Sequence, residues 1–133
     1  MRSAKGFSII EVLVSLVVLS IALLGTAGLT AASLKTTNSS YYRTQATVLA
    51  DDILDRMRAN IEQARGGQYN IDSDPVTFAA APGTVEHFDA TEWTDTIAAT
   101  LPGGVGTVEV INGVATIVIS WGDGESFTTV SQL

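Results

Sequence analysis

The chain begins with a long hydrophobic stretch that is nearly free of charge. Residues 7–34 read FSIIEVLVSLVVLSIALLGTAGLTAASL, and Glu11 is the only charged side chain among them. A helix needs about 20 predominantly apolar residues to cross a bilayer, so this stretch predicts a transmembrane helix that is apolar on all sides. Arg2 and Lys5 precede it, which predicts a cytoplasmic N-terminus and a C-terminal domain on the other side of the membrane.

The hydrophobic pattern becomes periodic after Leu34. Over residues 35–65, which contain no proline, apolar side chains recur every three or four positions, at Tyr42, Ala46, Leu49, Ile53, Met57 and Ile61. This spacing predicts that the same helix continues as an amphipathic helix whose apolar stripe packs against a sheet. Gly66-Gly67 is expected to end it, because glycine is common directly after helices.

Residues 66–133 are predicted to form a small globular domain that starts with a loop and a short helix. Residues 68–88 have no sustained period, so we expect an irregular loop with one short strand at 76–79. Residues 89–101 are expected to form a helix, with Asp89 and Glu92 in a capping box and Trp93 on its buried face.

The C-terminal third predicts a β-meander over residues 107–130. Three segments rich in β-branched residues, 107–111, 114–121 and 126–130, are separated by turn residues, and Asn112-Gly113 is a strong hairpin signal. Alternation along the second segment places one set of side chains toward the helix: Ala115, Ile117, Ile119 and Trp121. The predicted fold class is α+β, with a long N-terminal helix, transmembrane and then amphipathic, packed on a small antiparallel sheet.

Composition excludes several classes of function. The net charge of −7 argues against nucleic-acid binding, which needs a basic surface, and the absence of cysteine excludes thiolate metal sites and cysteine nucleophiles. The single histidine, His87, is expected at the surface. Asp72-Ser73-Asp74 could offer oxygen ligands to calcium, but the full EF-hand spacing is missing and a solvated loop is expected. We therefore predict no cofactor, no metal and no enzymatic activity.

Glu11 is the residue in this sequence that most needs an explanation. A carboxylate inside a membrane helix costs up to about 3 kcal/mol, so it is a functional candidate whose partner should be named. Cleavage after Gly6 would make Phe7 a free N-terminus with an ammonium group. That group could pair with Glu11 of the same chain, four residues away on a helix, or with Glu11 of a neighbouring copy.

Residues 5–11, KGFSIIE, resemble the processing site of type IV pilins and the related pseudopilins. The resemblance implies that residues 1–6 are a leader peptide that prepilin peptidase removes by cleaving between Gly6 and Phe7. It also implies that Phe7 becomes N-methylated. In that family, the glutamate at the position of Glu11 neutralises the terminal amine of an adjacent subunit during assembly.

A second resemblance covers most of the chain. Residues 40–46 (SYYRTQA) and 49–60 (LADDILDRMRAN), together with Trp93 and the Leu101-Pro102-Gly103-Gly104 stop, look like the type IV pilus modification family, the PilV-type minor pilins. This implies a minor pilin in the bacterial inner membrane with a periplasmic C-terminal domain. It would contact other minor pilins and the major pilin through its N-terminal helix and enter a surface pilus.

Other interpretations remain open. A minor pseudopilin of a type II secretion system would share the Gly6, Phe7 and Glu11 pattern. The apolar stretch could also be a secretory signal with an exit at Gly25-Thr26-Ala27, or a plain anchor in which Glu11 has no role. The sequence contains no catalytic motif that would favour a membrane-anchored enzyme. An adhesive module using Trp93, Trp121 or the 68–88 loop is compatible with a minor pilin.

Overall fold

The computed structural model describes residues 6–73, 76–122 and 124–133 of the chain. The chain divides into two units, residues 1–39 and residues 40–133, which are described separately below as the stem and the head. The helices and strands are α1 (Ile9–Ala59), α2 (Ile61–Arg65), β1 (Ile71–Ser73), β2 (Val76–Phe78), α3 (Val85–Thr100), β3 (Val105–Ile111), β4 (Val114–Trp121) and β5 (Glu125–Gln132).

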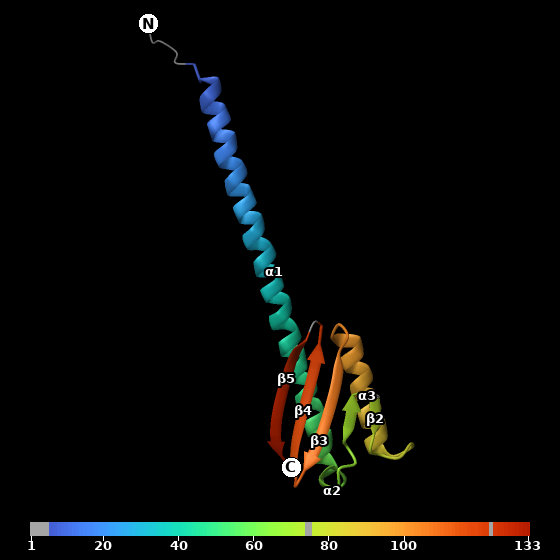
Figure 1. Cartoon of the computed structure of the whole chain (residues 1–133). Helices are drawn as coiled ribbons and strands as arrows, with labels where there is room; N and C mark the ends of the chain where they lie inside the picture. The colour runs from blue at the N-terminus through green and yellow to red at the C-terminus, as the bar shows by residue number, and fades with distance from the viewer. Residues whose placement is uncertain (1–5, 74–75, 123) are drawn as a thin grey trace. The chain divides into compact units, whose positions relative to one another are not determined.

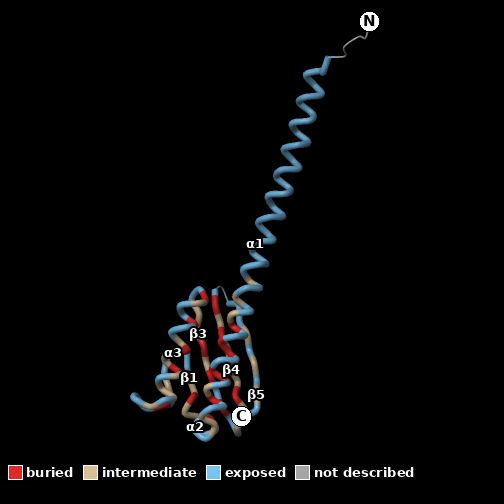
Figure 2. The backbone as a smooth tube through the Cα atoms, turned by 180° about the vertical axis from the view of Figure 1, so that it is seen from behind, coloured by how far each residue is buried: buried red, intermediate tan, exposed pale blue. Residues whose placement is uncertain are grey.

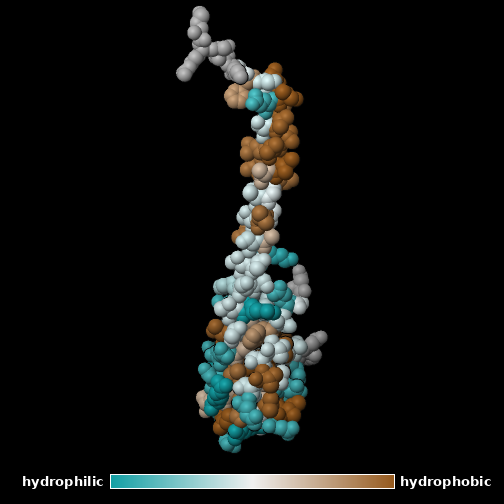
Figure 3. Space-filling view, turned by 90° about the vertical axis from the view of Figure 1, so that its left-hand side faces the viewer, coloured by the Kyte–Doolittle hydropathy of each residue, from teal (hydrophilic) through white to brown (hydrophobic). Residues whose placement is uncertain are grey.

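The stem consists of the first part of α1, and its side chains are not covered by any other element. Every described residue from Gly6 to Asn38 is exposed (Figure 2), and apolar side chains dominate its N-terminal surface (Figure 3). The helix contains a window long and apolar enough to cross a membrane, with a mean hydropathy of 2.5 and none of it buried. An isolated surface of this kind requires lipid or other apolar helices around it.

The head is a two-layer structure of helices on one face of an antiparallel sheet. The sheet has the strand order β2-β1-β3-β4-β5, and residues 40–59 of α1 lie beside α3 on the same face (Figure 1). All strand pairs are antiparallel, and β3, β4 and β5 form the meander. The α+β class and the pilin-like arrangement predicted from the sequence are confirmed.

The core is built mainly from residues of α1, α3 and the sheet, whose buried positions are red in Figure 2. The α1 stripe contributes Ala46, Leu49, Ala50, Ile53, Leu54 and Met57. On β4, burial alternates along the strand, and the buried side chains are Ala115, Ile117, Ile119 and Trp121, as predicted. Tyr42 and Ile61, at the two ends of the predicted stripe, are partly buried against this core.

The long helix is interrupted at Asn60, where the sequence predicted continuity to residue 65. The backbone of Asn60 has φ −127° and ψ 54°, which ends α1 at Ala59, and α2 follows as a separate helical segment. The Asn60 side chain donates a hydrogen bond of 2.6 Å to the carboxylate of Glu86 at the start of α3. A side chain bonded to a distant element competes with regular helix at this position, and the periodicity of apolar residues does not reveal such a contact.

Helix α3 starts four residues earlier than the predicted range of 89–101, and the predicted capping box is wrong. Thr84 is the N-cap, and its hydroxyl accepts a hydrogen bond of 3.3 Å from the backbone N–H of His87. Asp89 lies inside the helix and bonds to other elements instead. His87 is therefore half-buried rather than at the surface, and its ring meets Phe78 edge-on at 5.2 Å.

The sheet is larger than predicted, because it has two additional strands before β3 and because β3 and β5 are longer than expected. Two short strands, β1 and β2, pair with each other in the region predicted as a loop with one strand, and Ile71 joins β1 to β3 opposite Val108. Three-residue strands are too short to give a readable alternation. Strand β3 begins at Val105, two residues before the predicted start, and β5 extends from Glu125 to Gln132.

Gly106, the second residue of β3, lies against the buried face of α3. A Cβ atom at this position would lie 2.5 Å from both Trp93 Cη2 and Ile97 Cδ1, closer than van der Waals contact allows. The glycine thus lets the buried indole of α3 rest directly on the strand backbone. Glycine inside a strand often marks such a close approach.

We expect Gly106→Ala to destabilise the head by about 1–3 kcal/mol, because the added methyl group overpacks the contact with Trp93 and Ile97. The measurement is thermal unfolding of the full chain in detergent, followed by near-ultraviolet circular dichroism of the tryptophans. Gly66→Ala is the matched control: Gly66 has φ −73°, and its added Cβ would have no neighbour closer than 3.4 Å. It should change the free energy of unfolding by less than about 0.5 kcal/mol. Equal effects of the two variants would contradict the packing argument.

Candidate processing and assembly site

The predicted cleavage site lies just outside the first turn of α1. Gly6 and Phe7 precede the helix, which begins at Ile9, and the side chain of Phe7 is 83% exposed. The carbonyl oxygen of Ser8 accepts hydrogen bonds from the backbone N–H groups of Glu11 (3.0 Å) and Val12 (3.3 Å). The bond between Gly6 and Phe7 therefore belongs to non-helical, exposed backbone, which is the state a peptidase can bind in extended form.

Glu11 occupies the first turn of the helix, where a negative charge is favourable because the helix dipole is positive at this end. Phe7, however, lies before the helix. The expectation that Phe7 and Glu11 share a helix face, made from their spacing of four, therefore does not apply in this structure.

Four hydroxyl side chains of the apolar stretch form hydrogen bonds within the helix. Ser15 and Ser20 each donate a hydrogen bond of 2.7 Å to the carbonyl oxygen four residues earlier, and Thr30 does the same at 2.9 Å. Thr26 donates to Leu23, three residues earlier. Hydroxyl groups bonded in this way can enter an apolar environment at little cost. Glu11 alone keeps an ionisable group that needs a partner from outside its own helix.

The N-terminal segment that contains Gly6, Phe7 and Glu11 resembles a known protein family. Residues 1–27 match the family model of the prokaryotic N-terminal methylation motif. The match supports a type IV pilin-like protein and indicates a substrate that prepilin peptidase cleaves and methylates. Comparisons with curated proteins and with solved structures gave no match. The motif and the apolar helix together are consistent with membrane anchoring and with incorporation into a pilus.

A second polar cluster ties α1 to α3 inside the head. The guanidinium of Arg56 contacts Asp52 at 3.1 Å on its own helix, and Asp89 at 3.1 Å and Glu92 at 2.8 Å on α3. These carboxylates raise the pKa of Arg56 further above its usual value, the hydrogen bond to Glu92 contributing most and that to Asp89 next. The sequence suggested neither this cluster nor the role of Asp89, because the two α3 partners of Arg56 are 33 and 36 residues away from it along the chain.

Tyr69 completes the cluster from the buried side. Its side chain is fully buried, and its hydroxyl donates a hydrogen bond of 2.8 Å to the second oxygen of Asp89. Burial, and then the bond to Asp89, raise the pKa of Tyr69 to about 12. Asp89 thus accepts from a cation on one oxygen and from a neutral donor on the other, which fixes the orientation of α3 against the end of α1.

The remaining candidate sites from the sequence find no support as binding sites. Within residues 6–73, 76–122 and 124–133, no group of three or more acidic or histidine side chains could hold a metal ion. Asp72 and Ser73 are exposed and belong to β1 rather than to a loop, while Asp74 lies outside the described residues. Trp93 and Trp121 are both buried in the core, so neither is available as an adhesive surface.

We expect the stability of the head to fall as the pH rises from about 10 to about 12, and Tyr69→Phe to remove part of this slope. The folded state holds the Tyr69 proton more tightly than the unfolded chain, whose pKa is the ordinary value of 10.0, so deprotonation favours unfolding in that window. No lysine lies in residues 40–133 to titrate alongside it. The measurement is urea unfolding at pH 9 to 12.

Tyr41→Phe is the control for this experiment, because Tyr41 is 55% exposed on α1. It should leave the slope unchanged. An identical slope in the wild type and in Tyr69→Phe would contradict the role given to the buried hydroxyl.

Proposed function

We propose that this chain is a minor pilin that prepilin peptidase cleaves between Gly6 and Phe7 and N-methylates at Phe7. In this proposal the processed chain joins, and helps to prime, a type IV pilus. The observation that carries it is the combination of an accessible Gly6–Phe7 bond with a first-turn carboxylate, Glu11, at the start of an apolar helix that no other element covers. The chain is then a substrate and a structural subunit, not an enzyme.

The stem provides the physical mechanism of assembly. Helices that leave lipid for a bundle of other helices exchange one apolar environment for another, so close packing and polar contacts must stabilise the bundle. Pairing the Phe7 ammonium with Glu11 of a neighbour would neutralise two charges that are each costly when alone. That pairing would also set the axial register of adjacent stems.

The assignment to minor pilins of the PilV type rests on the segment that carries the sequence resemblance. Within residues 49–60, Met57 is fully buried, Arg56 bonds to Asp89 and Glu92, and Asn60 bonds to Glu86. The resembling side chains are thus the ones that attach α3 to α1. A minor pseudopilin of a type II secretion system is the alternative. It would show itself by a secretion defect in a deletion strain whose surface pili are intact.

The test is mass spectrometry of the N-terminal peptide in sheared surface filaments and in cell membranes. A peptide that begins with N-methylated Phe7 in the filament fraction supports a processed pilus subunit. The same peptide restricted to membranes favours a pseudopilin. A start at Met1, or after Ala27, would overturn the proposed processing and leave an anchored or secreted domain.

We expect Glu11→Ala to leave cleavage and methylation intact while the amount of the chain in sheared filaments falls by about tenfold or more. The reason is that an unpaired ammonium in an apolar bundle costs several kcal/mol, and each 1.4 kcal/mol is a factor of ten. Ser15→Ala is the control in the same stem, because the Ser15 hydroxyl bonds only to a carbonyl of its own helix. Normal incorporation of the Glu11 variant would sink the pairing mechanism.

A further inference from the structure

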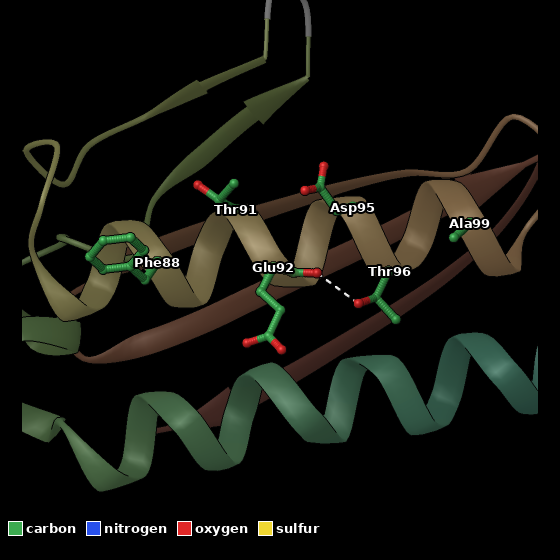
Figure 4. A pocket seen from close by; sticks show the side chains of 6 residues that line it. All are labelled: Phe88, Thr91, Glu92, Asp95, Thr96 and Ala99. Atoms are coloured by element: carbon green, nitrogen blue, oxygen red, sulfur yellow. Dashed lines mark hydrogen bonds between the residues drawn. The ribbon is translucent and has the colours of Figure 1, made fainter.

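Helix α3 presents an acidic face beside a shallow hollow on the surface of the head. The helix carries four carboxylates, Glu86, Asp89, Glu92 and Asp95, and has no lysine or arginine. The hollow has a volume of about 480 Å³ and is lined by Phe88, Thr91, Glu92, Asp95, Thr96 and Ala99 (Figure 4). Phe88, at one end, is 65% exposed, so the hollow combines an apolar anchor point with negative charge.

A second hollow lies on the other flank of α3. It has a volume of about 350 Å³, shares Thr91 and Asp95 with the first, and is bounded by Val76 and Phe78 of β2 and by the start of β3. Asp95 therefore stands on a ridge between two concave, partly apolar surfaces. A partner could insert one side chain into each hollow, with the Asp95 carboxylate between them.

Among the described residues, Asp95 is the α3 carboxylate to which the head supplies neither a cation nor a hydrogen-bonding amide. Arg56 binds Asp89 and Glu92, and the Asn60 amide binds Glu86. Figure 4 shows the Glu92 side chain pointing toward α1 and the Asp95 side chain pointing away from it. Glu92 accepts a hydrogen bond from Arg56 of α1. Among the described residues, Asp95 has no ion pair. A cation that complements this face must therefore come from another molecule.

The net charge of the head indicates whether the molecule that binds this face is a second copy of the chain or a different protein. Residues 40–133 hold four of the seven basic and thirteen of the fourteen acidic side chains, a net charge of −9 with His87 neutral. Two such heads repel each other, and like charges placed opposite one another across an interface cost several kcal/mol. Stems that pack side by side nevertheless bring heads within reach of one another, so each neighbour must present a compatible surface.

We propose that the α3 face, centred on Asp95 and flanked by Phe88 and Ala99, docks the head of a different pilin-like subunit through a basic segment that carries apolar side chains. This rests on the proposed function, because the partner is another chain with its own N-terminal methylation motif. The two hollows take the apolar side chains, and Asp95 binds a lysine or arginine between them. The chain thus pairs with unlike subunits rather than with itself.

The experiment places a photo-crosslinking phenylalanine derivative at Ala99, which is exposed, in the full-length chain in its native host. The expected product is an adduct with a second protein that has its own N-terminal methylation motif and a basic head, identified by mass spectrometry. Asp95→Lys should lower the adduct yield by about tenfold or more, and Asp95→Asn by a smaller factor. Glu109→Lys is the matched control: Glu109 is exposed on the opposite face of the sheet, and its reversal should leave the yield unchanged.

Several outcomes would overturn the proposal. They are an adduct with a second copy of this chain, an adduct with a protein that lacks the motif, a yield insensitive to Asp95→Lys, and no adduct although the chain is present with methylated Phe7. Thermal unfolding of each variant shows that its head remains folded. The N-terminal peptide in the same sample reports on processing, so a failure of the docking surface and a failure of the proposed function can be distinguished.

Discussion

The indole of Trp93 is the contact on which the head depends most. It reaches from α3 to α1, where its Nε1–H donates a hydrogen bond of 2.7 Å to the carbonyl oxygen of Leu49, and its ring rests on the bare backbone of Gly106 in β3. One side chain thereby connects both helices and the sheet. A buried indole must bond its N–H, and a helix carbonyl that accepts a second donor fixes the rotation of α1 about its axis. The apolar stripe of α1 then faces the sheet in one register.

A different constraint governs the stem, where nothing in the chain covers the apolar side chains. The described residues of the head form a buried apolar core that contains no charged side chain, whereas residues 7–34 of the stem are all exposed and carry one charge, at Glu11. Helix α1 belongs to both regimes because its sequence changes from uniform to periodic apolarity after Leu34. The same helix can therefore lie in a membrane or a helix bundle at its N-terminal end and pack into a folded core at its C-terminal end.

The sequence predicted those features of the fold that depend on periodicity or on local turns. The α1 stripe, the Asn112-Gly113 hairpin and the buried face of β4 all follow from spacing, and the structure confirms them. Several of the errors share a physical cause, which is that a tertiary contact decided the local structure. Asn60 breaks the helix while bonded to Glu86, and β3 includes Gly106, a residue type depleted in strands, where Trp93 packs on the strand backbone. Asp89 suggested an N-cap by its type, but Arg56 and Tyr69 hold it inside the helix.

The two candidate sites differ in the same way: one can be read from local sequence, and the other depends on contacts between distant elements. Gly6, Phe7 and Glu11 could be found from the sequence because they are neighbours along the chain. The α3 face could not, because only the structure shows which of its four carboxylates bond to Arg56 or Asn60. This division also fits what each part can contribute to assembly. Apolar stems pack on one another with little discrimination, since lipid and helix surfaces are similarly apolar. The proposed ammonium–carboxylate pair would be the same at every stem and so would not distinguish subunits. In that case, selectivity among neighbouring subunits comes from the heads. Like charges that face each other across an interface are costly, whereas opposite charges are not.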